Sequence, residues 1–389
     1  MEASVTSEDD AGSDATLSSA STITTASADL NSDLNFSLAI TSHPAAVERP
    51  QKKSQLVGIT KRRNWLERFK PQRPTQEERR AARAALASRK DEGFVASQLR
   101  EGRVLLHRNG KQLVTLTPNG SAEIAWQHPD ILGAIGAREE GVVVLSPNHL
   151  AIDVSAWQEA EILERAEGIF VGTRELMGIG TREALGDASR ARALLTWHAT
   201  TKFCGACGHE TTPIEGGAKR VCGACSRRYY PRIDPVAIAL VRSADDQKIL
   251  LGRTPKLRKG MYTCLSGFVE PCETVEDAVR REVFEEAGVL VDAVTLWASQ
   301  PWPIGRAGGC ELMLACVAEA SAAASTIDVD ETEMEDVRWF TRQEARAAFD
   351  AAVAYAHQPA GAAEDGVVFV PGDYAIAHHL IKSWLFPPP

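Results

Sequence analysis

Residues 267 to 289 read Gly-Phe-Val-Glu-Pro-Cys-Glu-Thr-Val-Glu-Asp-Ala-Val-Arg-Arg-Glu-Val-Phe-Glu-Glu-Ala-Gly-Val. Within this stretch Glu282, Glu285 and Glu286 stand at i, i+3 and i+4, positions that share one face of an α-helix. Three like charges on one face repel one another, so such a face favours a bound cation. Because hard divalent cations prefer oxygen ligands, the stretch predicts a site for Mg²⁺ or Mn²⁺.

The residues around the three carboxylates predict where this helix begins and ends. Thr274 with Asp277 resembles a capping box, which starts a helix, and Gly288 suits the left-handed residue that ends one. We expect Arg281 to brace the loop before the helix through Glu273, and not to touch a substrate. One apolar stripe of the helix should pack on a sheet: Val279, Val283 and Ala287.

The spacing is more specific than a cluster of charges. The stretch satisfies each position of G-x5-E-x7-R-E-U-x-E-E-x-G-U, where U is apolar. This pattern resembles the Nudix box, the signature of hydrolases that cleave a diphosphate joined to a nucleoside. The alternative, an exposed acidic helix without function, does not account for glycines and an arginine at set positions. The fixed positions are Gly267, Glu273, Arg281, Glu282, Glu285, Glu286 and Gly288.

A diphosphate is a poor electrophile because its own negative charge repels nucleophiles. Bound metal ions neutralise that charge and acidify a water molecule. Glu282 and Glu286 are the first candidates for metal ligands, whereas Glu285 could be a ligand or the base that deprotonates the water. The spacing does not separate these two roles of Glu285.

Upstream of this stretch stand Cys204-Gly-Ala-Cys207 and Cys222-Gly-Ala-Cys225, two C-x2-C pairs separated by fourteen residues. This arrangement is typical of a zinc ribbon with four cysteine ligands. Four thiolates leave no open position on the metal, so we expect one structural Zn²⁺ per chain. The alternatives are two disulfides or a redox pair; the paired repeat and the lack of a secretion signal disfavour them.

Ser299-Gln-Pro-Trp-Pro303 follows the box. A four-cysteine ribbon, a Nudix box and this motif together resemble the NADH pyrophosphatase family, from about Thr201 to the C-terminus. The resemblance implies hydrolysis of NAD(H) to nicotinamide mononucleotide and AMP by metal-activated water, in a homodimer. It also implies an alternative with the same chemistry, removal of the NAD cap from RNA. Hydrolysis of ADP-ribose or another nucleoside diphosphate is a further alternative.

The resemblance also assigns residues outside the box. It implies that the carbonyl of Ser266 faces a metal and that Glu333, six positions before Trp339, is another acidic ligand. The neighbouring acidic residues make that choice less certain: Glu331, Glu335 and Asp336. Substrate contacts are implied for Tyr230, Gln300, Pro301, Trp302, Pro303 and Ala377.

Some of these residues have plainer roles to weigh. Tyr230 could pack on the zinc knuckle, and a lone tryptophan is often a core residue. We expect His378 and His379 to lie on a helix surface.

One segment departs from the family pattern, Pro-Trp-Pro-Phe-Pro-x-Ser-Leu-Met. Here the chain runs Pro303-Ile-Gly-Arg-Ala-Gly-Gly-Cys-Glu-Leu-Met313, with Glu311 in place of the serine. The choice among NADH, NADPH and NAD therefore stays open. Arg306 could pair with a 2′-phosphate, because guanidinium suits phosphate geometry, although a solvated loop arginine is the favoured alternative.

The chain has 389 residues, more than one typical domain. We expect an α+β protein in four parts: a disordered tail (1–34), a small α+β N-terminal domain (35–199), the zinc ribbon (200–231) and the Nudix domain (232–389). The tail is rich in Ser, Thr, Ala and Asp and cannot bury enough apolar area to fold. For the Nudix domain we expect an α/β/α sandwich with a mixed sheet.

Candidate strands and helices follow from apolar runs. In the Nudix part the candidate strands are Val236–Val241, Lys248–Gly252, Tyr262–Leu265, Thr295–Ser299, Leu312–Val317 and Val337–Phe340. In the N-terminal part we expect strands at 103–107, 112–116 and 141–145, and helices at 157–168 and 180–197.

Charge and composition limit the partners. Residues 51–90 hold thirteen Lys/Arg against three Glu, whereas the whole chain carries −9. The basic segment could steer capped RNA, although a solvated surface helix or linker is the favoured interpretation. No run approaches a membrane span of about 18 apolar residues. We expect an intracellular, cytoplasmic protein, with a peroxisome, mitochondrion or plastid left open, and free thiols at Cys264, Cys272, Cys310 and Cys316.

Two rival functions belong to other classes. A non-catalytic nucleotide sensor with the same fold is expected to lose a box carboxylate, and this chain has all of them. A zinc-ribbon adaptor for nucleic acid predicts strong, salt-dependent binding without turnover.

Overall fold

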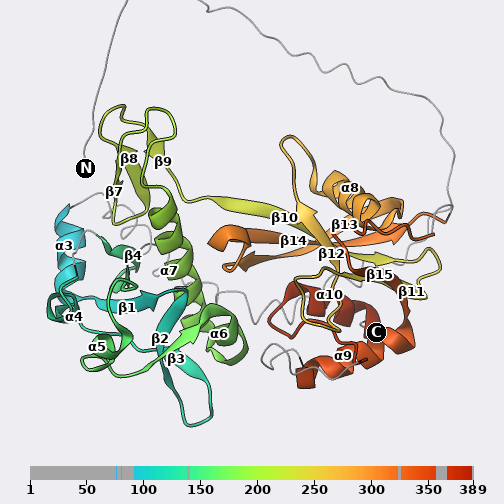
Figure 1. Ribbon diagram of the computed structural model, residues 1–389, viewed down its shortest axis with the longest axis horizontal. Coiled ribbons are helices and arrows are strands. Elements are labelled where there is room, and N and C mark those ends of the chain that lie inside the picture. Colours follow the sequence, from blue (N-terminus) through green and yellow to red (C-terminus); the bar gives the residue numbers. More distant parts are fainter. Residues whose placement is uncertain are drawn as a thin grey trace, which may run out of the picture. The chain divides into compact units, whose positions relative to one another are not determined.

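A sheet of six strands forms the centre of the C-terminal half in this computed structural model (Figure 1). Its order is β13-β14-β10-β11-β15, with β12 paired to β10. β10 and β14 run parallel and the other neighbours antiparallel, which confirms the predicted mixed sheet. The strands are β10 (Ile233–Arg242), β11 (Lys248–Arg253), β12 (Leu265–Phe268), β13 (Val291–Trp302), β14 (Cys310–Ala320) and β15 (Asp336–Thr341).

The structure describes residues 92–137, 141–322, 326–355 and 366–387, with the isolated helical positions 76 and 80. All of them lie in one unit, residues 54–389. The expectations for the tail 1–34 and for nearly all of the basic segment 51–90 concern residues outside this description.

Helices cover both faces of the C-terminal sheet (Figure 1). Because side chains alternate along a strand, Ala237, Ala239 and Val241 of β10 join the apolar cluster of α8 (Val275–Ala287). Ile238 and Leu240 join the opposite cluster, with α9 (Arg342–Tyr355) and α10 (Ile376–Leu385). This is the predicted α/β/α sandwich.

A second six-stranded sheet lies in the N-terminal half, in the order β3-β2-β1-β5-β4, with β6 paired to β2. Its two faces carry separate apolar clusters. The strands are β1 (Arg103–Arg108), β2 (Lys111–Leu116), β3 (Ala122–Ile124), β4 (Val143–Ser146), β5 (His149–Asp153) and β6 (Ile169–Gly172). The helices are α3 (Glu92–Glu101), α4 (Asp130–Ala134), α5 (Glu159–Leu163), α6 (Thr173–Ile179) and α7 (Arg182–Thr200).

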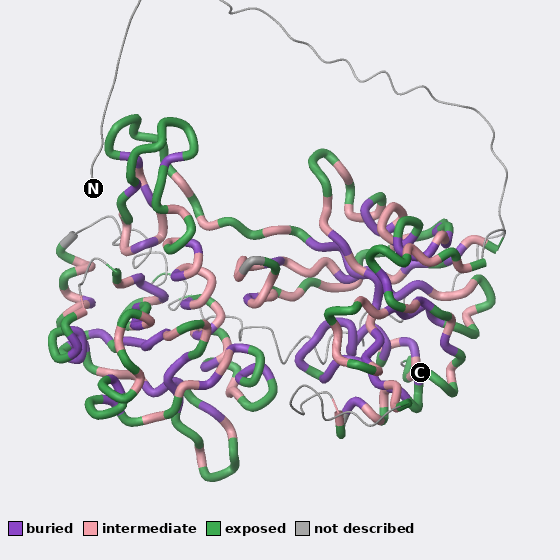
Figure 2. Tube along the Cα trace, viewed as in Figure 1, coloured by how far each residue is buried: buried purple, intermediate pink, exposed green. Residues whose placement is uncertain are grey.

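A small three-stranded sheet separates these halves in the sequence, formed by β7 (Thr211–Ile214), β8 (Lys219–Cys222) and β9 (Arg228–Tyr229). Its loops are exposed and its buried positions are few (Figure 2). In contrast, buried residues line both larger sheets in the same view. No helix in the described ranges is long and apolar enough to cross a bilayer.

Three sequence expectations differ from the structure. The strand expected at 262–265 instead spans Leu265–Phe268, because pairing with β10 sets its position: Gly267 lies opposite Ala237. The helix expected at 157–168 is only Glu159–Leu163, and Gly168, with φ of 142°, precedes the next strand.

The third difference concerns the two adjacent histidines of α10. His378 and His379 are buried, not on the helix surface. The ring of His378 lies 4.3 Å from that of Phe349 on α9, and its Nδ1 is 2.9 Å from the carbonyl oxygen of Pro371. α10 is therefore buried around more of its circumference than an amphipathic surface helix.

Candidate active site

The helix α8 has the ends that its sequence predicts. The hydroxyl of Thr274 accepts a hydrogen bond from the backbone N–H of Asp277 at 3.2 Å. Gly288 ends the helix in the left-handed conformation, with φ of 65°. Val279, Val283 and Ala287 are buried against the sheet, so the carboxylate face of α8 has a fixed direction.

Arg281 connects the helix to the loop that precedes it. Its Nε and Nη2 donate to the two carboxylate oxygens of Glu273, each at 2.9 Å, and Nη2 also donates to the carbonyl of Phe268 at 2.8 Å. Nη1 donates to Glu282 at 2.8 Å and to Glu285 at 3.1 Å. The hydrogen bonds from Arg281 lower the pKa of Glu273. The expected brace between Arg281 and Glu273 is thus present, and it also holds two box carboxylates in place.

Glu286 is a buried carboxylate that forms no ion pair among the residues described. The residue is 6% exposed, and its Oε2 has no hydrogen-bond partner among the residues described. Burial, then the charges of Glu282 and Glu333, raise its pKa to about 8, against a backbone hydrogen bond from Ser266. Burial also raises the pKa of Glu282, where Glu285 and Glu333 add repulsion. A divalent cation would relieve this repulsion and use the free oxygen, so the donor set fits one.

Glu333 reaches this cluster because its segment is attached to the end of α8. The N–H groups of Asp328 and Asp330 donate to the carbonyls of Ala287 and Glu286, at 2.9 and 3.4 Å. Glu333 follows on this segment and is exposed.

The structure also favours Glu333 over two of its acidic neighbours. Glu335 forms an ion pair with Arg253 at 2.9 Å, and Asp336 accepts a hydrogen bond from Tyr262. These two carboxylates are therefore occupied elsewhere, whereas the charge of Glu333 acts on Glu282 and Glu286.

The box glycine is required by the closeness of Glu282. A Cβ on Gly267 would lie 1.8 Å from the carboxyl carbon of Glu282 and 2.0 Å from each of its oxygens. No side chain fits there unless Glu282 moves. The backbone of β12 at Gly267 therefore packs directly against the carboxylate of Glu282.

We predict that Gly267→Ala lowers the rate of diphosphate hydrolysis, the reaction that the box sequence implies, by about a hundredfold or more, since displacing a reacting group by about 1 Å can cost that much. The reason is loss of the Glu282 position, and the overall fold should persist. Steady-state kinetics and a thermal melt measure the two effects. Gly186→Ala on α7, where a Cβ meets nothing within 4 Å, is the matched control. An activity equal to that of the control would contradict the prediction.

The four ribbon cysteines come together as expected. One sulfur from each lies within 4.8 Å of the others, with Cys204–Cys225 and Cys207–Cys222 sulfur pairs at 3.5 Å. These distances exceed a disulfide bond of about 2.05 Å and approach the edge, about 3.8 Å, of a tetrahedron with 2.3 Å zinc–sulfur bonds. The donor set therefore fits a structural Zn²⁺.

Sequence reasoning missed one residue of this cluster. The hydroxyl of Tyr229 donates to the sulfur of Cys204 at 3.0 Å, and this hydrogen bond is the largest of the effects that together lower the pKa of Cys204 to about 5. The signal in the sequence was the pair Tyr229-Tyr230, of which only the second was considered.

Comparison with known proteins agrees with both features. A model of the NADH pyrophosphatase zinc ribbon domain matches residues 199–230, and a model of the NUDIX domain matches residues 233–358. The chain is 36% identical over 245 residues to the NAD-capped RNA hydrolase NudC of Deinococcus radiodurans, covering 62% of this chain and 78% of that protein. The chain belongs to the Nudix hydrolase family.

Two other relatives extend well beyond the part that matches this chain. Nudix hydrolase 19, chloroplastic, from Arabidopsis thaliana is 36% identical over 290 residues, which cover 64% of this chain and 66% of that protein. The human NAD-capped RNA hydrolase NUDT12 is 43% identical over 218 residues, 54% of this chain and 43% of that protein. This Nudix chain thus spans less than two thirds of the length of either relative.

Two predicted substrate residues of the Nudix domain lie beside each other. The side-chain nitrogen of Gln300 donates to the carbonyl of Tyr374 at 2.7 Å, and its oxygen accepts from the N–H of Ile376 at 2.8 Å. These bonds hold the start of α10, where the buried Ala377 is the next residue. Gln300 therefore positions this segment, and its contact with a dinucleotide stays a prediction.

The other predicted substrate residues differ in exposure. Trp302 is half-buried against an apolar cluster of Met177, Tyr374 and Ala375, so it has a packing role in addition to any stacking. Pro301 is exposed and Pro303 is buried.

Tyr230 lies in the open, 59% exposed, with the Lys219 nitrogen 5.5 Å from its ring centre. Tyr229 takes the place on the zinc knuckle that was considered for Tyr230.

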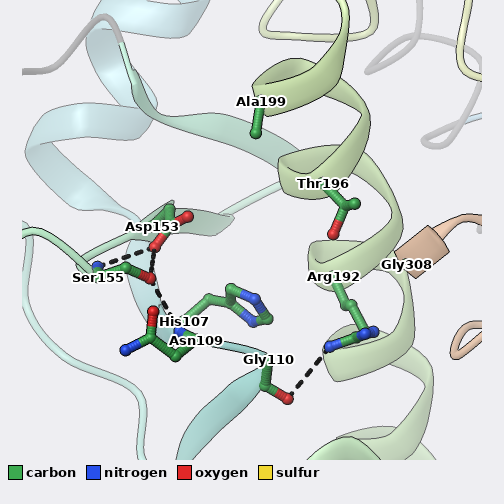
Figure 3. A pocket seen from close by; sticks show the side chains of 9 residues that line it. All are labelled: His107, Asn109, Gly110, Asp153, Ser155, Arg192, Thr196, Ala199 and Gly308. Atoms are coloured by element: carbon green, nitrogen blue, oxygen red, sulfur yellow. Dashed lines mark hydrogen bonds between the residues drawn. The ribbon is translucent and has the colours of Figure 1, made fainter.

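A polar pocket of about 390 Å³ lies apart from the box carboxylates, mainly between the N-terminal sheet and α7 (Figure 3). Its polar groups largely bind each other: Asp153 accepts from the N–H of Ser155 at 2.8 Å, and Arg192 donates to the carbonyl of Gly110 at 3.3 Å. Burial lowers the pKa of the pocket residue His107 to about 4. None of the predicted site residues lines this pocket.

Proposed function

We propose that this protein hydrolyses the diphosphate bond of NAD(H) to nicotinamide mononucleotide and AMP. The observation that carries the proposal is the cluster of three carboxylates, Glu282 and Glu286 on α8 and Glu333 on the segment attached to its end, with a buried and unpartnered oxygen on Glu286. Relatives named NAD-capped RNA hydrolase and NAD(P)H pyrophosphatase support the choice of a nicotinamide dinucleotide.

Four groups would hold Mg²⁺ or Mn²⁺: the carboxylates of Glu282, Glu286 and Glu333 and the carbonyl of Ser266. When bound, the metal would neutralise the diphosphate and acidify a water molecule. In the hydrolysis, a water oxygen would bond to one phosphorus as the bridging P–O bond breaks, the other phosphate would leave with the bridging oxygen, and Glu285 would take the proton of the water.

The chain's own residues prepare this reaction. Arg281 fixes Glu282 and occupies Oε2 of Glu285, which leaves Oε1 of Glu285 available to accept the proton. Glu285 is exposed, as a base that must reach solvent-derived water should be. Its alternative role is that of a further metal ligand.

Removal of the NAD cap from RNA is the second candidate function, because it requires cleavage of the same bond. The names of the human and Deinococcus relatives favour it. The basic segment 51–90, which could attract the RNA, lies outside the described residues.

One experiment ranks these functions. NADH, NADPH, NAD, ADP-ribose and an NAD-capped oligonucleotide are compared at matched concentration with Mg²⁺ and with Mn²⁺, and the products are identified. We expect nicotinamide mononucleotide and AMP from NAD, their reduced mononucleotide counterpart and AMP from NADH, and the reduced mononucleotide and 2′-phospho-AMP from NADPH. A much higher kcat/KM for ADP-ribose would refute the inference from the tryptophan motif, and salt-dependent binding without turnover would favour an adaptor or a sensor.

We further propose a homodimer. Phe284, Leu290 and Leu296 are exposed on or beside α8 and the edge strand β13, which provides apolar area for self-association. Light scattering during gel filtration gives the mass of the assembly. We also propose an intracellular location, in keeping with four free cysteines outside the ribbon. Imaging of a fluorescent fusion distinguishes the cytoplasm from the alternatives of a peroxisome, mitochondrion or plastid.

A further inference from the structure

The loop between β13 and β14, where this chain departs from the family pattern, has a defined shape. Gly305 N–H donates to Gly309 at 3.0 Å, and Gly309 N–H donates to Arg306 at 3.0 Å, around the short turn Arg306–Gly308. Glu311, 8% exposed, accepts from the N–H of Arg306 at 2.8 Å. A Cβ on Gly305 would lie 2.7 Å from the Glu311 carboxyl carbon, so the glycine admits this anchor. Glu311 thus holds the loop and, indirectly, sets the position of Arg306.

The side chain of Arg306 is directed to the Nudix box. Its guanidinium carbon lies 4.4 Å from the ring centre of Phe268, the residue after Gly267. The carbonyl of Phe268 accepts a hydrogen bond from Arg281, which also donates to Glu282. The contact with Phe268 therefore places the guanidinium against the residue that follows Gly267, the glycine that Glu282 touches.

The donors of Arg306 remain available, whereas those of the nearby Arg281 are used. Arg281 donates to three carboxylates and one carbonyl. In the described ranges, no carboxylate forms an ion pair with the guanidinium of Arg306, and this residue is exposed. A guanidinium has five N–H donors, in a planar arrangement that matches phosphate oxygens.

We propose that Arg306 binds a non-bridging oxygen of the substrate's diphosphate, beside the carboxylates that hold the metal. This assignment rests on the proposed function, because it needs a diphosphate in that cluster. It differs from the pairing with a 2′-phosphate considered from sequence, because the side chain contacts Phe268, the residue that follows the box glycine Gly267. The contact with Phe268 restricts the Arg306 side chain before the substrate binds, so less rotamer freedom is lost on binding.

The test compares Arg306→Ala and Arg306→Lys with the wild type, using NADH and NADPH at saturating Mn²⁺. We expect Arg306→Ala to lower kcat/KM about 10- to 100-fold for both substrates, the range for a lost hydrogen bond to a charged group. Arg306→Lys should recover part of the loss. The Mn²⁺ concentration for half-maximal activity and the melting temperature should not change.

Arg346→Ala is the matched control, since Arg346 also stacks on a phenylalanine, Phe386, at 4.6 Å, but on α9. It should leave kcat/KM within twofold of the wild type. A change of less than twofold in Arg306→Ala would overturn the proposal. So would a loss confined to NADPH, which indicates the 2′-phosphate, or a loss that added Mn²⁺ reverses.

A binding measurement separates this inference from the proposed function. ADP is titrated into wild type and Arg306→Ala by calorimetry in the presence of Ca²⁺, so that no turnover is needed. We expect at least tenfold weaker binding of ADP by the variant. If the wild type hydrolyses no dinucleotide, the proposed function fails while this difference still supports Arg306. Equal affinities, or no binding of ADP to the wild type, would overturn the inference.

Discussion

Replacing Glu286 by alanine is expected to abolish diphosphate hydrolysis, with kcat lowered about a thousandfold or more, because the metal supplies several kcal/mol of charge stabilisation. Glu286 is the most buried carboxylate of the cluster, and its free oxygen has no partner among the described residues. No neighbouring side chain of α8 can replace it, since Glu282 rests against Gly267 and both Glu282 and Glu285 are held by Arg281. Kinetics with NADH at a series of Mn²⁺ concentrations measure the loss.

Glu276→Ala is the matched control, on the same helix but in its first turn. It should retain turnover, and both variants should keep their zinc. If Glu286→Ala keeps a rate within threefold of the wild type, the carboxylate cluster is not the catalytic centre.

The metal-free protein should reveal the same residue through pH. The folded pKa of Glu286 is about 8, above the ordinary value of 4.5, chiefly because of burial. A raised carboxyl pKa favours the folded state while the group is protonated, so this stability is present below about pH 4.5 and is lost as the pH rises through about 8. Urea unfolding in EDTA should therefore give a free energy of unfolding that falls by a few kcal/mol across this range.

Glu286→Gln separates this effect from other titrations. The glutamine cannot ionise, so the variant should lose less stability between about pH 4.5 and 8 than the wild type does. Added Mg²⁺ should remove most of the wild-type loss. Equal pH slopes for the two proteins in EDTA would contradict the assigned burial of the charge.

The parts of this site that the sequence predicts well are local in the chain. Thr274 and Gly288 cap the two ends of α8 through contacts within a few residues, and Arg281 donates to Glu273, eight positions earlier in the chain. The cysteine cluster is likewise predictable from the sequence, because the two cysteines of each pair are only three positions apart in the chain. In these cases the separation of two residues along the chain is enough to predict that they are in contact.

The parts that the sequence left open depend on distant partners. The choice of Glu333 from an acidic run required knowing that Glu335 pairs with Arg253 and that Asp336 accepts from Tyr262. The polar type of His378 suggested a surface position, yet the residue is buried, with its ring against Phe349. No pattern within α10 reports such a contact.

Arg306 shows the same limit most clearly. From sequence a solvated loop arginine was the favoured interpretation, and the residue is indeed exposed. Its relation to the box depends on Phe268, 38 positions earlier, and on the anchoring of the loop by Glu311. Only the paired sheet brings these segments together, through β10 between β12 and β14.

Exchanging Cys222 for alanine is expected to unfold the zinc ribbon and to remove zinc from the protein. Cys222 is buried, and its sulfur also accepts a hydrogen bond from the N–H of Cys225 at 3.5 Å. The ribbon has only three short strands, whose buried positions are few, so it has little core to hold it without metal. Small domains of this kind are commonly folded with zinc and unfolded without it. Elemental analysis should give one zinc per wild-type chain and none in Cys222→Ala, and proteolysis should cut the variant within 199–230.

A graded variant distinguishes a metal site from mere packing of four thiols. Tyr229→Phe keeps the ring but removes the hydrogen bond to Cys204, and loss of such a contact commonly weakens metal binding about 10- to 100-fold. Zinc should therefore pass to a chelator faster from Tyr229→Phe than from the wild type. Cys272→Ala, an exposed cysteine outside the ribbon, should keep both zinc and protease resistance. A wild-type protein that is free of metal and yet fully resistant to proteolysis would exclude the structural zinc, because four unligated thiols cannot replace the bonds that hold the knuckles together.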